Sequence, residues 1–274
     1  MTSDMGLFGL AVMGQNFALN VAEKGFKISV SNRSPGKVEE CVARAKGELG
    51  DKAGNLTGFP GKTMEEKKAF VESLKKPRRI MFLVKAGAPV DAVIADFKQL
   101  LEEGDILIDG GNEWYENSER RGSELGEKGV HYIAMGVSGG ETGARNGPSL
   151  MPGTNSKEAY EAMKPILEAV SAKSEVGNCV TLFLGQGAGN YVKMVHNGIE
   201  YADMQLISEV YDLMKHSGMS NDEMSAKFKG WNAGMLDSYL IEITHKILAK
   251  RDMDQIKVGL IQLQCHLSFR PSPP

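Results

Sequence analysis

The first half of the chain alternates short β-branched runs with longer amphipathic stretches, and this alternation constrains the fold more than any other feature. It is typical of a parallel sheet covered by helices. The predicted strands are residues 5–8, 27–30, 80–84, 105–108, 131–134 and 181–184. The predicted helices between them are residues 16–23, 36–46, 90–101 and 118–127. Residues 49–60 are rich in Gly, Asn and Pro, which predicts a loop.

The pattern changes in the last third of the chain. From residue 190 onward strand-like runs are absent and helical periodicity covers most of the remaining length. Apolar residues between 190 and 216 fall on two stripes, which indicates a helix with neighbours on more than one side. We therefore predict an α/β domain over residues 1–186, a partial all-helical domain over 187–256 and an irregular tail over 257–274, which ends in several prolines.

Composition narrows the class of partner. The 32 basic and 35 acidic residues give a formal net charge of −3, which indicates neither nucleic acid nor an acidic lipid surface as a partner. The longest aliphatic and aromatic stretch, residues 80–84, is far below the ~20 residues of a membrane helix. Cys41, Cys179 and Cys265 are scattered, and match neither a disulfide framework nor a metal site. We expect a cytoplasmic protein that acts on a small molecule, without a metal.

A glycine-rich turn follows the first predicted strand. Gly9, Ala11 and Gly14 have the G-x-A-x-x-G spacing of a dinucleotide-binding loop. The spacing lets backbone N–H groups approach a pyrophosphate at the start of the next helix. An ordinary tight turn between strand and helix is the alternative. The glycine-rich segment follows the first strand of an alternating pattern, and this position favours a dinucleotide-binding loop. It also favours a Rossmann-like, doubly wound α/β fold.

The end of the second predicted strand indicates which dinucleotide is bound. An NAD site offers a carboxylate to the ribose 2′-hydroxyl, whereas an NADP site offers an arginine to the 2′-phosphate. Here the strand ends in Asn32, Arg33 and Ser34, and the first acid afterwards is Glu39. The alternative is an ordinary surface arginine in a turn. Given the glycine loop, Arg33 favours NADP.

Three glycine-rich polar loops follow other predicted strands, at residues 85–88, 109–113 and 136–140. Ligands in open α/β folds bind outside the carboxyl ends of the strands. Glycine pairs allow close backbone approach, and Asn112 and Ser138 offer directional hydrogen bonds. Each loop alone could be a simple turn, but three at one sheet edge predict a site.

The long predicted helix carries a polar stripe of Lys193, His196, Asn197 and Glu200. Their spacing places all four on one helix face. Such a stripe is either a solvated edge with local ion pairs or an acid/base array. The glycines of residues 185–189 would allow this helix to pack tightly against the cofactor domain, which favours the array.

Several of these segments together resemble 6-phosphogluconate dehydrogenases, the decarboxylating NADP enzymes of the pentose phosphate pathway, in the β-hydroxyacid dehydrogenase superfamily. The matching stretches are GLAVMGQN (9–16), NRS (32–34), LVKAGAPVD (83–91), DGGNEWYENSERR (109–121), GVSGGETGARNGPSLMPG (136–153), GNYVKMVHNGIEYADMQLISE (189–209) and SYLIEIT (238–244). They run in order through about nine-tenths of the chain.

The resemblance implies oxidative decarboxylation of 6-phosphogluconate to ribulose 5-phosphate, CO2 and NADPH. Lys193 would be the general base, for which it must be neutral, and Glu200 would protonate the enol. The implied substrate ligands are Asn112, Ser138, Gly139, Gly140, His196, Asn197 and, for the phosphate, Tyr201. The implied cofactor ligands are Gly9, Leu10, Ala11, Val12, Met13, Gly14, Asn32, Arg33, Ser34, Val84, Lys85, Ala86 and Asn112.

The chain departs from the family pattern in four places. Thr142 replaces a usual acid, Thr154 replaces a usual glycine, and Asn190 stands where many members have His. After about Arg251 the pattern stops, so the C-terminal part that carries further phosphate ligands and completes the family's homodimer is not matched. The leading hypothesis is a dehydrogenase of this family with a complete cofactor domain and a truncated helical domain, in which truncation impairs activity. The alternatives are an NADP-binding fragment without turnover and a dehydrogenase of another β-hydroxy acid.

Overall fold

The computed structural model describes residues 2–251 of the chain. These residues divide into two compact units, one ending at Val195 and the other beginning at His196. The predicted tail over residues 257–274, like the expected departure from the family pattern after about Arg251, lies outside the described residues.

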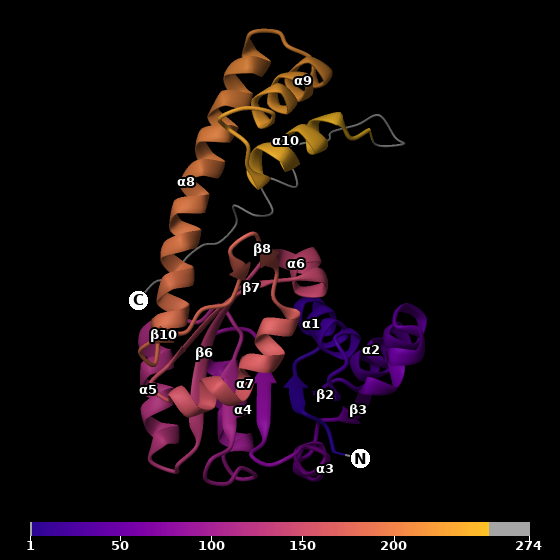
Figure 1. The fold of residues 1–274 in the computed structure, drawn as a ribbon, viewed down its shortest axis with the longest axis vertical. Helices are drawn as coiled ribbons and strands as arrows, with labels where there is room; N and C mark the ends of the chain where they lie inside the picture. The colour runs from indigo at the N-terminus through magenta and orange to yellow at the C-terminus, as the bar shows by residue number, and fades with distance from the viewer. Residues whose placement is uncertain (1, 252–274) are drawn as a thin grey trace. The chain divides into compact units, whose positions relative to one another are not determined.

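An eight-stranded sheet forms the centre of the first unit (Figure 1). Its order is β10-β7-β6-β5-β4-β1-β2-β3, and only β6 and β7 pair in an antiparallel direction. The strands are β1 (Met5–Phe8), β2 (Ile28–Asn32), β3 (Leu56–Pro60), β4 (Arg79–Phe82), β5 (Ile106–Asp109), β6 (His131–Ser138), β7 (Ser149–Thr154) and β10 (Phe183–Leu184). Two short strands, β8 (Lys173–Ser174) and β9 (Gly177–Asn178), form a separate hairpin. The predicted doubly wound, mostly parallel sheet is confirmed.

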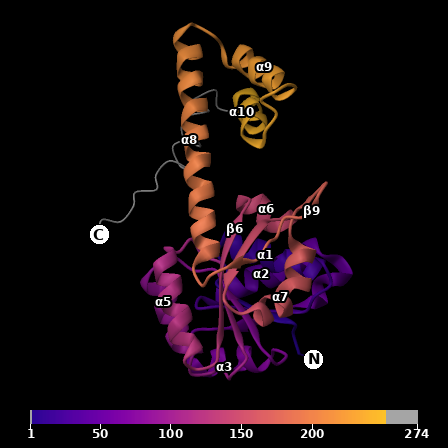
Figure 2. The same ribbon diagram turned by 60° about the vertical axis from the view of Figure 1, so that its left-hand side comes forward.

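Helices cover both faces of the sheet. The helices of this unit are α1 (Val12–Glu23), α2 (Pro35–Glu48), α3 (Met64–Glu72), α4 (Ala88–Phe97), α5 (Tyr115–Gly126), α6 (Gly140–Asn146) and α7 (Lys157–Val170), with a 3-10 helix, η1 (Gly50–Asn55). One core cluster joins the sheet to α1, α2 and α7, and a second joins it to α3, α4 and α5. Figure 2 shows α5 and α7 on opposite sides of the strands.

Side chains on the central strands β1, β4, β5 and β6 alternate between these two cores. Met81 belongs to the first cluster, whereas its neighbours Ile80 and Phe82 belong to the second. Successive side chains of a strand point to opposite faces, so a strand buried on both sides needs an unbroken apolar run. That requirement explains why the central strands could be located in the sequence.

Two loop predictions are wrong. Residues 49–60 hold η1 and β3, and β3 pairs in parallel with β2 from Leu56 to Pro60. Strand β6 continues past Ala134 to Ser138 because β7 pairs with it there. In both places the partner strand supplies the hydrogen bonds that the glycine-rich local sequence does not predict.

The second unit is helical throughout the described residues. Helix α8 (Ala188–His216) begins in the first unit and runs into the second, followed by α9 (Asn221–Asn232) and α10 (Tyr239–Ala249). Met224 and Phe228 of α9 pack with Ile241 and Leu248 of α10, and apolar side chains near the end of α8 pack against them. The predicted helical segment is confirmed as far as residue 251.

Candidate active site

The strand order locates a ligand crevice. β1 pairs with β2 on one side and with β4 on the other, so the order of strands reverses at β1. Dinucleotides bind across such a reversal, outside the carboxyl ends of the strands. The loops that begin after Phe8, Phe82, Asp109 and Ser138 all leave from that edge.

The glycine loop after β1 has room for backbone only. Gly9 has φ +105°, and a Cβ there would lie 2.4 Å from the carbonyl oxygen of Leu83. A Cβ on Gly14 would lie 1.9 Å from the carbonyl oxygen of Gly9. Helix α1 starts at Val12 without a side-chain cap, so its first N–H groups, which lack intrahelical partners, are donors for an anion. These residues fit a pyrophosphate group.

The end of β2 is joined to this loop. The backbone N–H of Leu10 donates to Oδ1 of Asn32 at 3.0 Å, and Nδ2 of Asn32 donates to the carbonyl oxygen of Ser34 at 3.2 Å. Arg33 lies between them and is exposed. Asn32 thus shapes the loop, while the Arg33 side chain is available to a ligand.

Lys193 lies in the first turns of α8 and is 9% exposed. Its Nζ donates to the carbonyl oxygen of Val137 at 2.6 Å and to Oδ1 of Asn112. Close packing makes this possible, since a Cβ on Gly136 would lie 2.8 Å from Cβ of Lys193. The structure therefore brings together the predicted catalytic lysine, the loop after β5 and the end of β6.

Ser138, Gly139 and Gly140 follow directly after Val137. Oγ of Ser138 is buried and has no hydrogen-bond partner within residues 2–251. Gly139 and Gly140 have φ of +122° and +59° and lead into α6. A buried hydroxyl without a partner costs free energy, which a ligand's polar group could recover. The unpartnered hydroxyl supports the prediction of a polar ligand beside Lys193.

The other predicted helix residues belong to the second unit. His196, Asn197, Glu200 and Tyr201 all lie in α8, after the division between the units. Nδ1 of His196 lies 3.1 Å from Oδ1 of Asn197 and 3.8 Å from a carboxylate oxygen of Glu200. These local contacts fit either the solvated edge or the array, so their roles stay predictions.

Several buried polar residues of the site were not singled out from the sequence. Arg121 is 1% exposed, and Glu113 and Asp109 are buried beside it. Burial raises the pKa of Asp109 to about 6, although the N–H of Gly111 and the hydroxyl of Tyr132 donate to it. Neither the residue types nor their spacing distinguish these side chains from solvated ones.

Two kinds of structure were not found in residues 2–251. No helix there is long and apolar enough to cross a membrane. No group of three or more His, Cys, Asp or Glu side chains in this part of the chain could hold a metal ion.

Two family patterns match the chain. The NAD binding domain of 6-phosphogluconate dehydrogenase matches residues 4–185, and the 6-phosphogluconate dehydrogenase C-terminal domain matches residues 189–263. Structures with no more than 22% identity, such as a 3-hydroxyisobutyrate dehydrogenase from Mycobacterium tuberculosis (17%, TM-score 0.69), share the fold.

Curated relatives are similar over about half of their own length. The Arabidopsis thaliana protein "6-phosphogluconate dehydrogenase, decarboxylating 1, chloroplastic" is 56% identical over 91% of this chain and 50% of its own. The Bacillus subtilis "6-phosphogluconate dehydrogenase, NADP(+)-dependent, decarboxylating" is 53% identical over 90% and 50%. Since some relatives are named chloroplastic, the cytoplasmic location stays a prediction.

A solved structure agrees with both comparisons. Plasmodium falciparum 6-phosphogluconate dehydrogenase, described in its apo form, with NADP+ and with 6-phosphogluconate, is 52% identical with a TM-score of 0.84. The match covers 94% of this chain and 53% of that one. The chain belongs to the 6-phosphogluconate dehydrogenase family.

Proposed function

We propose that this chain binds NADP+ and 6-phosphogluconate and catalyses the oxidative decarboxylation for which its relatives are named. The observation that carries the proposal is the placement of the Lys193 amine between Asn112 and Val137, the residue before Ser138, whose buried hydroxyl has no hydrogen-bond partner among residues 2–251. A buried amine held by fixed acceptors at the edge of a cofactor crevice is suited to proton transfer.

The cofactor would be held by backbone and by one charged side chain. The loop from Gly9 to Gly14 and the start of α1 would bind the pyrophosphate, and Arg33 would bind the 2′-phosphate. Asn32 and Ser34, Val84, Lys85 and Ala86, and Asn112 would complete the site. The chemistry that NADP+ would supply there is that of a hydride acceptor for the substrate carbon that is oxidised.

Lys193 would accept the proton of the C3 hydroxyl as the alcohol becomes a ketone. A neutral amine has two N–H bonds and one lone pair. Donation to the Val137 carbonyl and to Asn112 would hold the amine in place beside the substrate site, from where its lone pair would accept the proton. Loss of the carboxyl group as CO2 then leaves an enol, which Glu200 would protonate.

The proposed ligands of the sugar acid fall into two groups along the chain. In the first unit these are Asn112, Ser138, Gly139 and Gly140, where the hydroxyl of Ser138 would gain a hydrogen bond that it lacks within residues 2–251. In the second unit they are His196 and Asn197, with Tyr201 at the phosphate. A homodimer, as the family resemblance implies, belongs to the same proposal.

Turnover by the wild type and the Lys193→Met variant tests the proposal. Purified chain with NADP+ and 6-phosphogluconate should produce NADPH, measured by absorbance. The variant should lose about 10²- to 10⁴-fold, the usual contribution of a general base, and bind NADP+ as tightly as the wild type. Equal rates for the two proteins would overturn the assignment of Lys193.

A second candidate is NADP binding without turnover. The NAD binding domain pattern matches residues 4–185, so this candidate needs only the cofactor loops of the first unit. Titration calorimetry distinguishes the two functions. Heat from NADP+ but none from 6-phosphogluconate, together with no NADPH, would establish the second candidate and overturn the first.

A further inference from the structure

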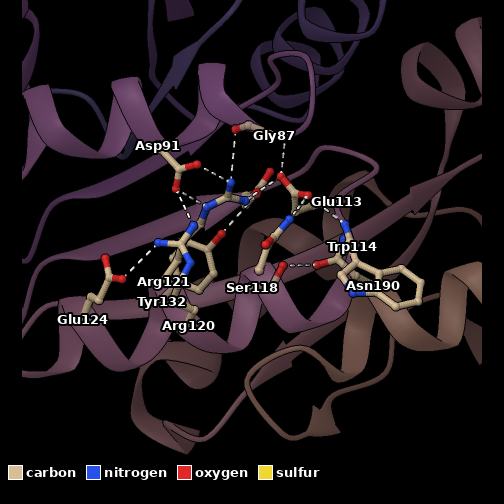
Figure 3. A network of polar contacts seen from close by, with 12 residues as sticks. Gly87, Asp91, Glu113, Trp114, Ser118, Arg120, Arg121, Glu124, Tyr132 and Asn190 are labelled. Atoms are coloured by element: carbon tan, nitrogen blue, oxygen red, sulfur yellow. Dashed lines mark hydrogen bonds and ion pairs between the residues drawn. The ribbon is translucent and has the colours of Figure 1, made fainter. Parts of the chain in front are cut away.

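Arg121, on α5, is a fully buried cation that joins two loops of the cofactor crevice (Figure 3). Its Nε and Nη2 donate to the two carboxylate oxygens of Asp91, at 2.8 and 3.0 Å. Its Nη2 also donates to the carbonyl oxygen of Gly87 at 3.1 Å, and its Nη1 donates to Oε2 of Glu113 at 2.5 Å. One guanidinium therefore contacts the loop after β4, the loop after β5 and the first turn of α4.

Glu113 completes the connection from the other side. Its Oε2 accepts the backbone N–H of Gly87 at 2.8 Å, and its Oε1 accepts the N–H of Trp114 at 2.8 Å and Nδ2 of Asn117 at 3.0 Å. Gly87 is thus fixed through its N–H by Glu113 and through its carbonyl by Arg121. Its φ of +87° is a conformation that favours glycine.

These contacts set the distance between two groups of proposed ligands. The residues just before Gly87 are Val84, Lys85 and Ala86, and the residue just before Glu113 is Asn112. Both groups lie beyond β4 and β5, on the opposite side of β1 from Asn32 and Arg33. Because a dinucleotide lies across the reversal of strand order, one half would contact β1 and β2 and the other half β4 and β5. With Arg33 at the adenosine 2′-phosphate, the loops joined by Arg121 would contact the nicotinamide half.

We propose that Arg121 is a positioning residue that holds the 84–87 and 109–113 loops in the arrangement that binds the nicotinamide half of NADP+. This inference rests on the proposed function, because it assumes that NADP+ is the ligand. Arg121 touches neither the cofactor nor the substrate in this proposal. It acts through Gly87 and Glu113.

Lysine cannot replace this arginine. A guanidinium presents five N–H donors in a planar fork, whereas an ammonium is a compact charge with three. Arg121→Lys keeps the charge opposite Glu113 and Asp91 but loses the simultaneous contacts to Asp91, Glu113 and Gly87. The neighbouring Arg120 supplies a matched control, since it also donates to Asp91, at 2.8 Å, but its side chain is about half exposed and its other ion pair is with Glu124, on its own helix.

Calorimetric binding of two ligands by the full chain tests the inference. NADP+ occupies both halves of the crevice, whereas adenosine 2′,5′-bisphosphate occupies only the adenosine half. Arg121→Lys should lower the affinity for NADP+ by about tenfold or more, equivalent to at least about 1.4 kcal/mol of binding free energy. Its affinity for the bisphosphate should stay within about twofold of the wild-type value. Arg120→Lys should change neither. Glu113→Gln, which leaves Gly87 and Arg121 with a weaker partner, should repeat the selective loss, and it serves as the test if Arg121→Lys does not fold.

Each other outcome counts against the proposal. Equal weakening of both ligands would assign Arg121 a purely structural role, and unchanged binding of both would show that the loops do not depend on it. A wild-type chain that binds neither ligand would overturn the proposed function, and with it this inference. If the wild type binds both ligands and the variants weaken both equally, this inference is overturned and the proposed function is not.

Discussion

Nδ2 of Asn190, in the first turn of α8, donates a hydrogen bond to the carbonyl oxygen of Gly111 at 3.2 Å. Its Oδ1 accepts the hydroxyl of Ser118 at 2.9 Å. Both bonds are buried, and Asn190 is three residues before Lys193. The start of the helix that carries the proposed base is therefore tied to the loop that carries Asn112.

We expect Asn190→Ala to lower the free energy of unfolding by about 1–3 kcal/mol, since it leaves a buried carbonyl and a buried hydroxyl without a partner. Urea unfolding of the wild type and of the variant measures the change. Adding Ser118→Ala to Asn190→Ala should cost less than the two single changes together, because it removes an orphaned donor. Strictly additive losses would contradict a direct Ser118–Asn190 bond.

The glycine loop makes a sharp prediction about Gly14. In Gly14→Ala the new Cβ would overlap the carbonyl oxygen of Gly9, 1.9 Å away, and neither atom can move without shifting the backbone. We expect a lower melting temperature and loss of NADP+ binding. Gly47→Ala is the matched control, because nothing lies within 4 Å of its Cβ and it lies in α2. It should stabilise the chain by about 0.5–1 kcal/mol and leave binding unchanged. NADP+ affinity equal to wild type in Gly14→Ala would refute the assignment of this loop.

Adjacent residues at the end of β2 should have separable effects. Arg33→Ala removes only an exposed side chain, so it should leave the affinity for NAD+ unchanged. The affinity for NADP+ should fall by about 10- to 100-fold, which is the effect of losing hydrogen bonds to a charged group. Asn32→Ala removes the acceptor for the N–H of Leu10, so it should weaken both nucleotides. Calorimetry with NADP+ and NAD+ tests both variants. If Arg33→Ala lowers the affinities for NADP+ and NAD+ equally, the assignment of Arg33 as the ligand of the 2′-phosphate is wrong.

The sequence predicts those parts of the fold in which local pattern and burial agree. Strands β1, β4 and β5 are apolar runs buried on both faces, and the structure has them within two residues of the predicted limits. β7 was missed because Ser149–Thr154 contains Pro and Gly and lacks alternation, and it becomes a strand by pairing with β6 and β10. Such pairing depends on residues far away in the sequence.

The site shows the same limit at the level of one side chain. Arg120 and Arg121 are adjacent in a polar helix, and nothing in their local sequence separates them. The Arg120 side chain is 47% exposed, whereas that of Arg121 is 1% exposed and is surrounded by Asp91, Glu113 and Gly87. Those partners come from two other segments, so the role of Arg121 becomes visible only when the loops are brought together. Lys193 was identified from its helix stripe, but its contact with Val137 was not.

Asp109 should make stability depend on pH in an unusual direction. It is fully buried at the end of β5, and burial raises its pKa from the ordinary 3.8 to about 6. Between these values the unfolded chain has lost a proton that the folded chain still holds, so the free energy of unfolding falls as pH rises from about 4 to about 6. At about 1.4 kcal/mol per pKa unit, the loss attributable to this group is about 3 kcal/mol.

Asp109→Asn isolates that contribution. The amide can still accept the N–H of Gly111 through Oδ1, but it does not titrate. Urea unfolding at several pH values should show the variant gaining about 3 kcal/mol relative to wild type as pH rises from about 3 to about 7, with about 2 kcal/mol of the gain between about pH 4 and about pH 6. Groups that titrate alike in both proteins, such as Asp91, whose contact with Arg121 lowers its pKa to about 2, cancel in this difference. Parallel profiles would mean that Asp109 is already ionised in the folded chain at pH 4, held so by Arg121 and its two hydrogen-bond donors.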